Sequence, residues 1–524
     1  MYLKLEKKEE ILIKIFLFVF VLILFIRSLW GPMWYDDSET GWVAEFDSVA
    51  LPIISLQYRG SFFPNESDIV QAREDFPILY DGVYNYDDLR ANKLIKVTSD
   101  KWMPFYFPVY SFLCLPVKVV LQILNINQDR CFLLTNSILI AVALYMVACR
   151  LKTSGLHRMF ALIMFILSPI YYYNSLISYE SCMFALVTIG MVMYANQKRN
   201  ISAAVISIAG MMNTGILAVA IVMIIEYLVK IIKSESNFKA LIINHWKVTL
   251  QYALCFTPAL VYPILQKIYL KEMIFTKFMD YTWWLERIKT YLFDFSIGFP
   301  SFTMGIWVFL IITIISVLRY REGGGYKSLV WLLFLIGSIS LISLHYHINS
   351  GMLLCARYVM WTYPIILIYL STIGIDFFKT TKIRTCVYSF VVLSSVVLMW
   401  VNHENALCLS KPNLTTKWIM DNIPSLYNPY YATFYCRVVD VHPEDNCYTC
   451  QNPGFYLDTS TGDIRKIIYY GNENAEQLVI DQISGGKESI EYIKKYIKAH
   501  ENDEKYHYIN ISPWSKYKIK LKGT

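Results

Sequence analysis

Charged residues are scarce in this sequence. Asp, Glu, Lys and Arg make up 17% of its 524 residues, whereas 56% are hydrophobic. A soluble protein of this length could not bury so much apolar surface, so the composition excludes a soluble fold and predicts an α-helical polytopic membrane protein. The net charge of +7 is scattered among loops, and no basic patch is interleaved with aromatic residues, so nucleic acid is not an expected partner.

Internal repeats, low-complexity tracts and a second Cys-x-x-Cys motif are also missing. Without a repeat, an inverted-repeat transporter fold has no support. Because Cys447-Tyr448-Thr449-Cys450 stands alone, it favours structural disulfides over zinc or redox chemistry. The disulfide candidates lie in the polar C-terminal tail, with three pairings open: Cys408, Cys436, Cys447 and Cys450.

Long apolar runs, by contrast, recur along the first 400 residues and predict about eleven membrane spans. With that number, every Lys and Arg group in the short loops falls on one side, which the positive-inside rule assigns to the cytoplasm. The N-terminus is then cytoplasmic, and segment 11–30 is a retained anchor because it lacks a small-residue cleavage site. The expected spans are 11–30, 131–149, 159–176, 180–195, 201–213, 216–232, 248–270, 302–318, 328–345, 358–378 and 384–401.

Two apolar stretches need separate treatment. Segment 105–124 contains Pro108, Pro116 and Lys118, so we expect a helix lying at the external surface rather than a span. The run 201–230 is split at the turn signal Asn213-Thr214-Gly215. Each half is shorter than the ~20 residues of a full crossing, which predicts a thinned membrane or a water-filled cavity at that turn.

The sequence divides into two expected domains. Residues 1–401 form a transmembrane module whose first external loop, 31–130, carries juxtamembrane helices. Residues 402–524 form a small external α+β domain, with helices near 417–422 and 488–500 and a strand at 432–441.

An acidic cluster follows the first span directly, in the stretch Met33-Trp34-Tyr35-Asp36-Asp37-Ser38-Glu39, and is followed by Trp42, Glu45 and Asp47. Carboxylates beside a low-dielectric membrane are costly unless they have a function. A carboxylate at this position can accept the proton of a hydroxyl that attacks a lipid-borne electrophile, which is general-base catalysis. Asp36 and Asp37 are therefore the candidate catalytic residues, whereas the acids between Glu66 and Asp100 read as a solvated loop.

Four motifs, in order along residues 1–400, resemble those of one enzyme group. They are Trp34-Tyr35-Asp36-Asp37, Lys101-Trp102-Met103-Pro104-Phe105-Tyr106-Phe107-Pro108, Leu167-Ser168-Pro169-Ile170-Tyr171-Tyr172-Tyr173 with Ser178-Tyr179-Glu180, and Ala356-Arg357-Tyr358-Val359-Met360-Trp361-Thr362-Tyr363-Pro364. The set resembles the GT-C superfamily of polyprenyl-phosphate-sugar-dependent glycosyltransferases, which includes lipid A aminoarabinose transferases and protein O-mannosyltransferases. The chain departs from that pattern at Asn213-Thr214-Gly215, where many relatives carry Lys or Arg.

The resemblance implies an inverting membrane glycosyltransferase of the bacterial inner (plasma) membrane with a periplasmic active site. It would move a hexosyl or pentosyl group from a polyprenyl-phosphate donor to a cell-envelope glycan, lipid or protein acceptor. Asp36, narrowly preferred, or Asp37 would be the base, and Glu180 a second acid or a partner of its helix dipole. The cations that bind the donor phosphate would be Lys101, Arg357 and, less favoured, Arg59. The side chains that line the cavity would be Tyr35, Tyr358, His345 and His347. No cofactor is required, a divalent cation (Mg²⁺ or Mn²⁺) is left open, and no metal ligands are assigned.

Two other functions stay open at this point. A polysaccharide polymerase or ligase of the O-antigen type would rely on basic external loops late in the chain, whereas the largest loop here comes first and is acidic. A non-enzymatic transporter or flippase for lipid-linked sugars predicts ionisable residues at mid-membrane. Glu226 is the main example, and it lies near the cytoplasmic end of its span.

Overall fold

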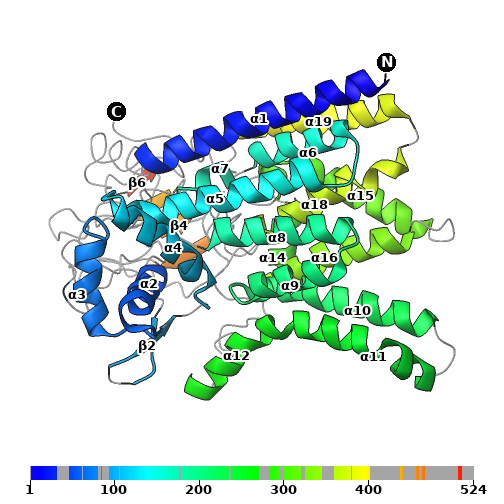
Figure 1. Cartoon of the computed structure of the whole chain (residues 1–524). Coiled ribbons are helices and arrows are strands. Elements are labelled where there is room, and N and C mark those ends of the chain that lie inside the picture. Colours follow the sequence, from blue (N-terminus) through cyan, green and yellow to red (C-terminus); the bar gives the residue numbers. More distant parts are fainter. Residues whose placement is uncertain are drawn as a thin grey trace.

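The computed structural model describes most of the first 401 residues and four short strands of the tail. The described ranges are 2–31, 47–61, 63–80, 84, 94–98, 100–104, 107–168, 170–175, 177, 179–234, 238–270, 284–293, 299–319, 325–344, 359–378, 380–401, 437–440, 456–458, 463–466 and 506–509. Figure 1 shows a helical bundle in which α1, α5, α6, α8 and α10 run along one common direction. The helices of the bundle are α1 (Tyr2–Trp30), α5 (Cys131–Tyr145), α6 (Gly155–Ile166), α8 (Glu180–Ala195), α9 (Arg199–Gly210), α10 (Leu217–Ser234), α11 (Phe238–Cys255), α12 (Thr257–Leu270), α15 (Gly305–Leu318), α16 (Gly325–Ser343), α18 (Tyr363–Ser371) and α19 (Thr381–Val401).

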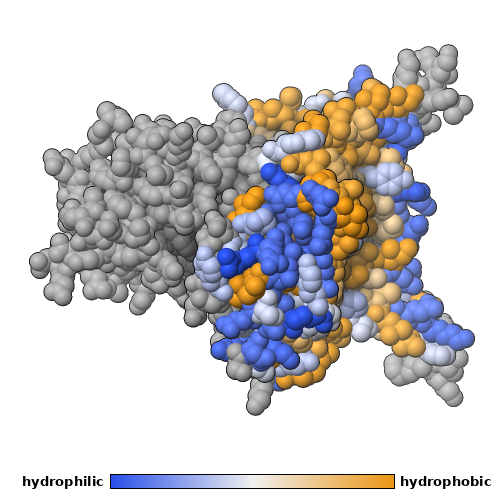
Figure 2. Space-filling view, turned by 60° about the vertical axis from the view of Figure 1, so that its left-hand side comes forward, coloured by the Kyte–Doolittle hydropathy of each residue, from blue (hydrophilic) through white to orange (hydrophobic). Residues whose placement is uncertain are grey.

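The protein is an α-helical, membrane-embedded protein. In the described part of the chain, four helices are long and apolar enough to cross a membrane: Glu9–Trp30, Gln128–Arg150, Gly325–Ser343 and Thr381–Trp400. A fifth crossing is formed if α11 and α12 count as one bent span. Exposed apolar side chains line most of Glu9–Trp30 and Thr381–Trp400, as expected where lipid replaces water, whereas Gln128–Arg150 is mostly buried within the bundle. Figure 2 shows hydrophobic residues along the flank of the molecule and hydrophilic residues gathered on the end turned forward.

Every expected span range contains a helix, but in two ranges the helix ends well before the predicted bound. The range 159–176 holds α6, which ends at Ile166, and the short α7 (Ile170–Tyr173), because Pro169 disfavours helix at the residue before it. The range 358–378 holds α18, of 9 residues, followed by the turn η7 (Gly374–Phe377). The run 201–230 is divided as predicted, because α9 ends at Gly210 and the turn η4 (Thr214–Ile216) precedes α10.

The range 248–270 is bent rather than straight. His245–Cys255 and Thr257–Leu270 meet at an angle of 53° around Phe256. Pro258 has no N–H to continue the helical hydrogen bonds, which explains a break at this point. The neighbouring N–H of Ala259 is satisfied from another helix, since the Ser207 hydroxyl of α9 accepts its hydrogen bond at 2.9 Å.

The first long connection folds at one end of the bundle, which we call the α2 end. It contains α2 (Asp47–Arg59), α3 (Glu66–Asp75), an antiparallel hairpin of β1 (Leu94–Lys96) and β2 (Trp102–Pro104), and α4 (Val109–Ile123). The expected helix within 105–124 is confirmed as α4. Juxtamembrane helices were expected in the loop 31–130 without bounds, and α2 and α3 are two helices of that loop, whereas the hairpin was not predicted. Asn65 begins α3 with a capping box, in which its side chain and that of Asp68 each accept the other's backbone N–H.

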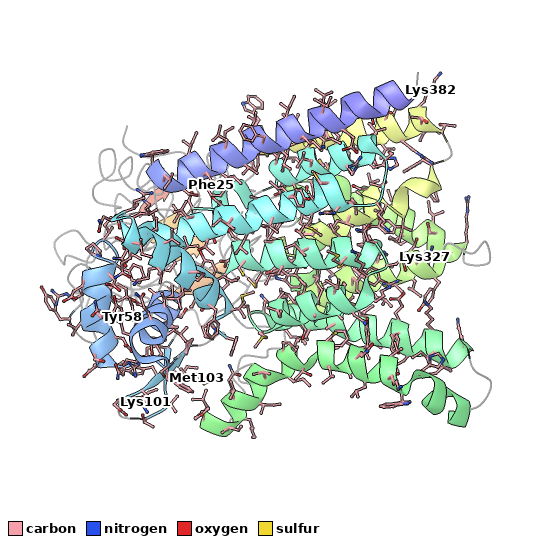
Figure 3. The ribbon with its side chains drawn as sticks, in the orientation of Figure 1. Phe25, Tyr58, Lys101, Met103, Lys327 and Lys382 are labelled. Carbon is pink, nitrogen blue, oxygen red and sulfur yellow. The ribbon has the colours of Figure 1, made fainter. Side chains whose placement is uncertain are left out.

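The opposite end of the bundle carries the basic loops. Lys327 and Lys382 lie there, far from Tyr58 and Lys101 at the α2 end (Figure 3). Arg158, near the start of α6, forms an ion pair with Glu10 near the start of α1, which ties these two helices together. The remaining elements are η2 (Gln128–Arg130), η3 (Met146–Arg150), α14 (Trp284–Phe293) and η5 (Phe299–Ser301).

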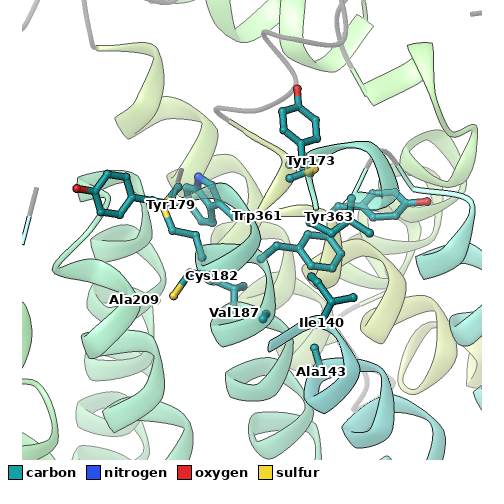
Figure 4. Packing of buried hydrophobic residues seen from close by; sticks show 14 of the residues in the cluster. Ile140, Ala143, Tyr173, Tyr179, Cys182, Val187, Ala209, Trp361 and Tyr363 are labelled. Carbon is teal, nitrogen blue, oxygen red and sulfur yellow. The ribbon is translucent and has the colours of Figure 1, made fainter. Parts of the chain in front are cut away.

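Large aromatic side chains fill the core toward the α2 end. Tyr179, Trp361 and Tyr363 lie above Cys182 and Val187 in Figure 4, and all five are at most 2% exposed. Close packing follows around them, because a Cβ on Gly215 would lie 2.5 Å from the Ile342 side chain of α16 and 2.9 Å from Trp361. Only glycine fits this close approach of η4 to α16 and Trp361.

The described part of the tail is an antiparallel four-stranded sheet in the order β5-β4-β3-β6. Its strands are β3 (Arg437–Asp440), β4 (Tyr456–Asp458), β5 (Asp463–Lys466) and β6 (Tyr506–Ile509). Strand β3 lies within the predicted strand 432–441. The predicted helices at 417–422 and 488–500 lie outside the described residues.

Candidate functional site

Two buried carboxylates stand at the first positions of two helices at the α2 end. Asp47 begins α2 and is 0% exposed, and Glu180 begins α8 and is 6% exposed. A negative charge at a helix N-terminus is favoured by the helix dipole, which lowers the cost of burying each of them. Burial and the nearby charge of Asp47 also raise the pKa of Tyr80 well above its ordinary value, so that this hydroxyl stays neutral.

A hydrogen bond joins the two helix starts. The hydroxyls of Ser48 and Tyr179 are 3.1 Å apart, and Tyr179 also donates to the Ser48 carbonyl at 3.2 Å. Each of these residues is the chain neighbour of one of the carboxylates. The fold therefore brings Asp47 and Glu180 to adjacent helix ends from distant parts of the sequence.

Further buried polar groups surround this hydrogen bond. We call them, together with Ser48 and Tyr179, the polar layer. The Tyr110 hydroxyl of α4 donates to Asn136 of α5 at 2.7 Å, and Asn136 donates to the Asn174 carbonyl at 3.1 Å. Asn174 in turn donates to Ser137 at 2.9 Å. Polar side chains inside a membrane protein are costly unless bonded, and such networks fix one arrangement of the helices around them. The polar layer is thus a rigid hydrophilic region within an apolar bundle.

The described cations of the predicted site lie elsewhere at the α2 end. Arg59 ends α2, and its guanidinium forms an ion pair with Asp68 at 2.6 Å. The α-helical rise places it about 18 Å along α2 from Asp47. Lys101 is exposed in the hairpin, next to Asp100, whose pKa is lowered chiefly by a hydrogen bond from Thr98 and further by Lys101 and Arg59. Glu180 therefore lies beside the polar layer, next to Tyr179, whereas Lys101 and Arg59 both act on Asp100 outside it.

Most of the other predicted site residues lie outside the described residues, so their roles stay predictions. This holds for the proposed bases, the third cation, the cavity-lining residues and the disulfide candidates: Asp36, Asp37, Arg357, Tyr35, Tyr358, His345, His347, Cys408, Cys436, Cys447 and Cys450.

Several residues of the polar layer were not predicted. Tyr179 belongs to the motif that contains Glu180, but its bond to Ser48 depends on tertiary contacts. A usable signal did exist for Asn136 and Ser137, because three consecutive polar residues, Thr135-Asn136-Ser137, interrupt the apolar run 131–149.

The described ranges contain no candidate metal site. No group of three or more His, Cys, Asp or Glu side chains there is placed to hold an ion. The question of a divalent cation therefore stays open.

The fold and the site together define a membrane-embedded helical protein with a buried polar layer at one end of its bundle. Searches against protein-family models, curated proteins and solved structures find no match to this chain.

Proposed function

We propose that the protein is an integral membrane glycosyltransferase that moves a sugar from a polyprenyl-phosphate donor to a cell-envelope acceptor. The observation that carries the proposal is the pair of buried carboxylates, Asp47 and Glu180, on adjacent helix ends. Asp47 opens the helix that follows the acidic segment of Asp36 and Asp37. The resemblance of four motifs to GT-C enzymes supports the same function.

The chemistry assigned to these residues is a single displacement with inversion. The acceptor oxygen forms a bond to the anomeric carbon while the bond from that carbon to the phosphate oxygen breaks. Asp36 or Asp37 takes the acceptor proton, and the polyprenyl phosphate leaves as an anion. Glu180 would orient the acceptor hydroxyl, and Lys101 and Arg357 would stabilise the phosphate. Arg59 is already engaged by Asp68, which weakens its claim to the same role.

The proposed topology is the one that the positive-inside rule predicts. It has about eleven spans in a bacterial inner membrane, with a cytoplasmic N-terminus and the α2 end and tail on the external side. The separation of Lys327 and Lys382 from Lys101 in Figure 3 supports this arrangement.

A transporter is less well supported. Its best candidate for a functional intramembrane acid, Glu226, is paired with Arg199 at 3.0 Å and accepts a hydrogen bond from Tyr194 at 2.7 Å. Because Arg199 neutralises the charge of Glu226, a structural role explains this acid and no transport function is needed for it.

The test is sugar transfer by the purified full chain in proteoliposomes with a radiolabelled polyprenyl-phosphate sugar and a crude envelope acceptor. Mass spectrometry of surface glycans from cells with and without the protein identifies the sugar. The Asp36→Asn/Asp37→Asn variant should lose about 10²- to 10⁴-fold of the transfer rate, the usual contribution of a general base. Glu66→Gln, an exposed acid of α3, is the matched control and should retain full activity. Undiminished transfer by the double variant would remove the assignment of the base.

A further inference from the structure

Two loops are fixed together at the end of the bundle opposite the polar layer. One follows η3 and leads into α6, and the other joins α8 to α9. The Asn196 side chain bridges them, because its oxygen accepts from the Lys152 N–H at 3.0 Å and its nitrogen donates to the Arg150 carbonyl at 2.8 Å. The two loops therefore present their side chains as one surface.

This surface carries three exposed cations, Arg150, Lys152 and Lys198, which we call the basic rim. Within the described ranges, none of the three takes part in an ion pair. The next cations along each loop differ, since Arg158 is paired with Glu10 and Arg199 with Glu226. Glu10 and Glu226 are thus engaged by other cations. The Glu9 side chain lies against Gly155 in the first of the two loops, but the three cations outnumber it, so the basic rim keeps a positive charge that an anion from outside the protein can meet.

A fourth cation reaches the same place from α1. The charges of Lys14 and Arg150 both act on the thiol of Cys149, at the end of the α5 span. Lys14 is exposed and in no ion pair in the described part of the chain. Lys14 therefore adds positive charge on the first helix, where Glu10 also acts on the same thiol and is itself paired with Arg158.

Exposed apolar side chains adjoin the basic rim. Tyr145 is 42% exposed one turn before Arg150, Leu156 is 37% exposed at the start of α6, and Ile201 is 48% exposed at the start of α9. Arg150 also lies 5.6 Å from the centroid of the Tyr145 ring. These residues continue the lipid-facing surface of the spans. A ligand that meets both features has an anionic head and an apolar tail.

We propose that the basic rim binds the phosphate of an anionic phospholipid, with the acyl chains along Leu156 and Ile201. The two clamped loops hold the cations before the lipid arrives, so little ordering is required on binding. This inference is independent of the proposed sugar transfer. A lipid held here would add to the polar contacts that already join these helices at this end, such as the ion pair of Arg158 with Glu10 and the hydrogen bond of Asn196 to Arg150.

Native mass spectrometry of the full chain in a neutral detergent tests the proposal. Phosphatidylglycerol is the anionic probe, phosphatidylcholine the neutral one, and inorganic phosphate the competitor. The Arg150→Gln/Lys152→Gln/Lys198→Gln variant should bind phosphatidylglycerol about a hundredfold more weakly, because each basic residue near an anionic lipid contributes ~1 kcal/mol, or about fivefold. Lys152→Gln and Lys198→Gln alone should each weaken binding about fivefold, which keeps the test valid if the triple variant does not fold.

The matched control removes three exposed lysines elsewhere at the same end, in Lys230→Gln/Lys327→Gln/Lys382→Gln, so that the net charge is equal. It should keep the wild-type affinity. Equal losses in both triple variants would show a diffuse charge effect and overturn the proposal. Equal binding of phosphatidylcholine would leave only apolar contact, and full displacement by inorganic phosphate would show a free anion site, so either result also overturns it.

Discussion

Lys118 is a cation without exposed surface. Its ammonium lies 2.6 Å from the Asp75 carboxylate and 2.5 Å from the Gln57 side-chain oxygen, so α4 is joined to α3 and α2 through one buried charge. Tyr58 donates to the same carboxylate at 2.9 Å. Burial, and then this bond to Asp75, raise the pKa of Tyr58 to about 12, which keeps it a donor.

Removing one partner of this pair should be costly. Lys118→Met leaves the buried Asp75 carboxylate without its cation and should lower the free energy of unfolding by about 3–5 kcal/mol. Adding Asp75→Asn should recover part of that loss. Denaturant unfolding in detergent measures both.

The control is the ion pair between α6 and α1. Glu10 is 41% exposed, so water solvates its carboxylate when the cation is removed, and Arg158→Met should cost no more than about 1 kcal/mol. Equal losses for Lys118→Met and Arg158→Met would contradict the importance given to burial.

At the scale of elements, α8 and α9 approach closely at Gly190. A Cβ on Gly190 would lie 2.7 Å from the end of the Ile206 side chain, and the Ser202 hydroxyl donates to the Gly190 carbonyl at 2.7 Å. The close packing of α8 against α9 therefore depends on the absence of a side chain at Gly190.

Gly190→Ala should therefore destabilise the protein by about 1–3 kcal/mol through overpacking. Gly337→Ala is the comparison, because a Cβ there meets only Ala218 at 3.5 Å, an ordinary contact. Thermal unfolding in detergent separates them, and Ile206→Ala should relieve part of the Gly190→Ala defect. A Gly190→Ala midpoint equal to that of Gly337→Ala would refute the close approach.

The sequence could predict where helices lie but not how they end or bend. Apolar runs identify the positions of the spans, and Asn213-Thr214-Gly215 correctly marks the division between α9 and α10. Pro169 signals the early end of α6, and Pro258 signals the bend between α11 and α12. The predicted bounds followed the apolar composition of these runs instead of the prolines. The hairpin of β1 and β2 is three residues a strand, too short for a pattern of alternation to be recognised.

At the scale of the whole molecule, the candidate site was likewise predictable from the sequence only in part. Glu180 was predicted from a local motif and is confirmed at a helix N-terminus. Its link to Asp47 through Tyr179 and Ser48 depends on two helices meeting in space, which no spacing in one sequence reveals.

The orientation of the molecule in its membrane can be tested with exposed lysines. A membrane-impermeant amine reagent applied to spheroplasts should modify Lys101 but not Lys327 or Lys382, because the last two lie at the opposite end. After lysis all three should react, as measured by mass spectrometry of the digested protein. Modification of Lys327 in sealed spheroplasts would reverse the proposed topology.

The bend between α11 and α12 adjusts the thickness of membrane that this helix pair crosses. A straight helix over His245–Leu270 would be roughly 39 Å long, well beyond the ~30 Å of a hydrocarbon core. With His245–Cys255 upright, an angle of 53° reduces the rise of α12 to about 13 Å and that of the whole segment to about 29 Å. As one bent span, the segment would match the bilayer through its shape, without tilting as a whole or stretching the lipid around it.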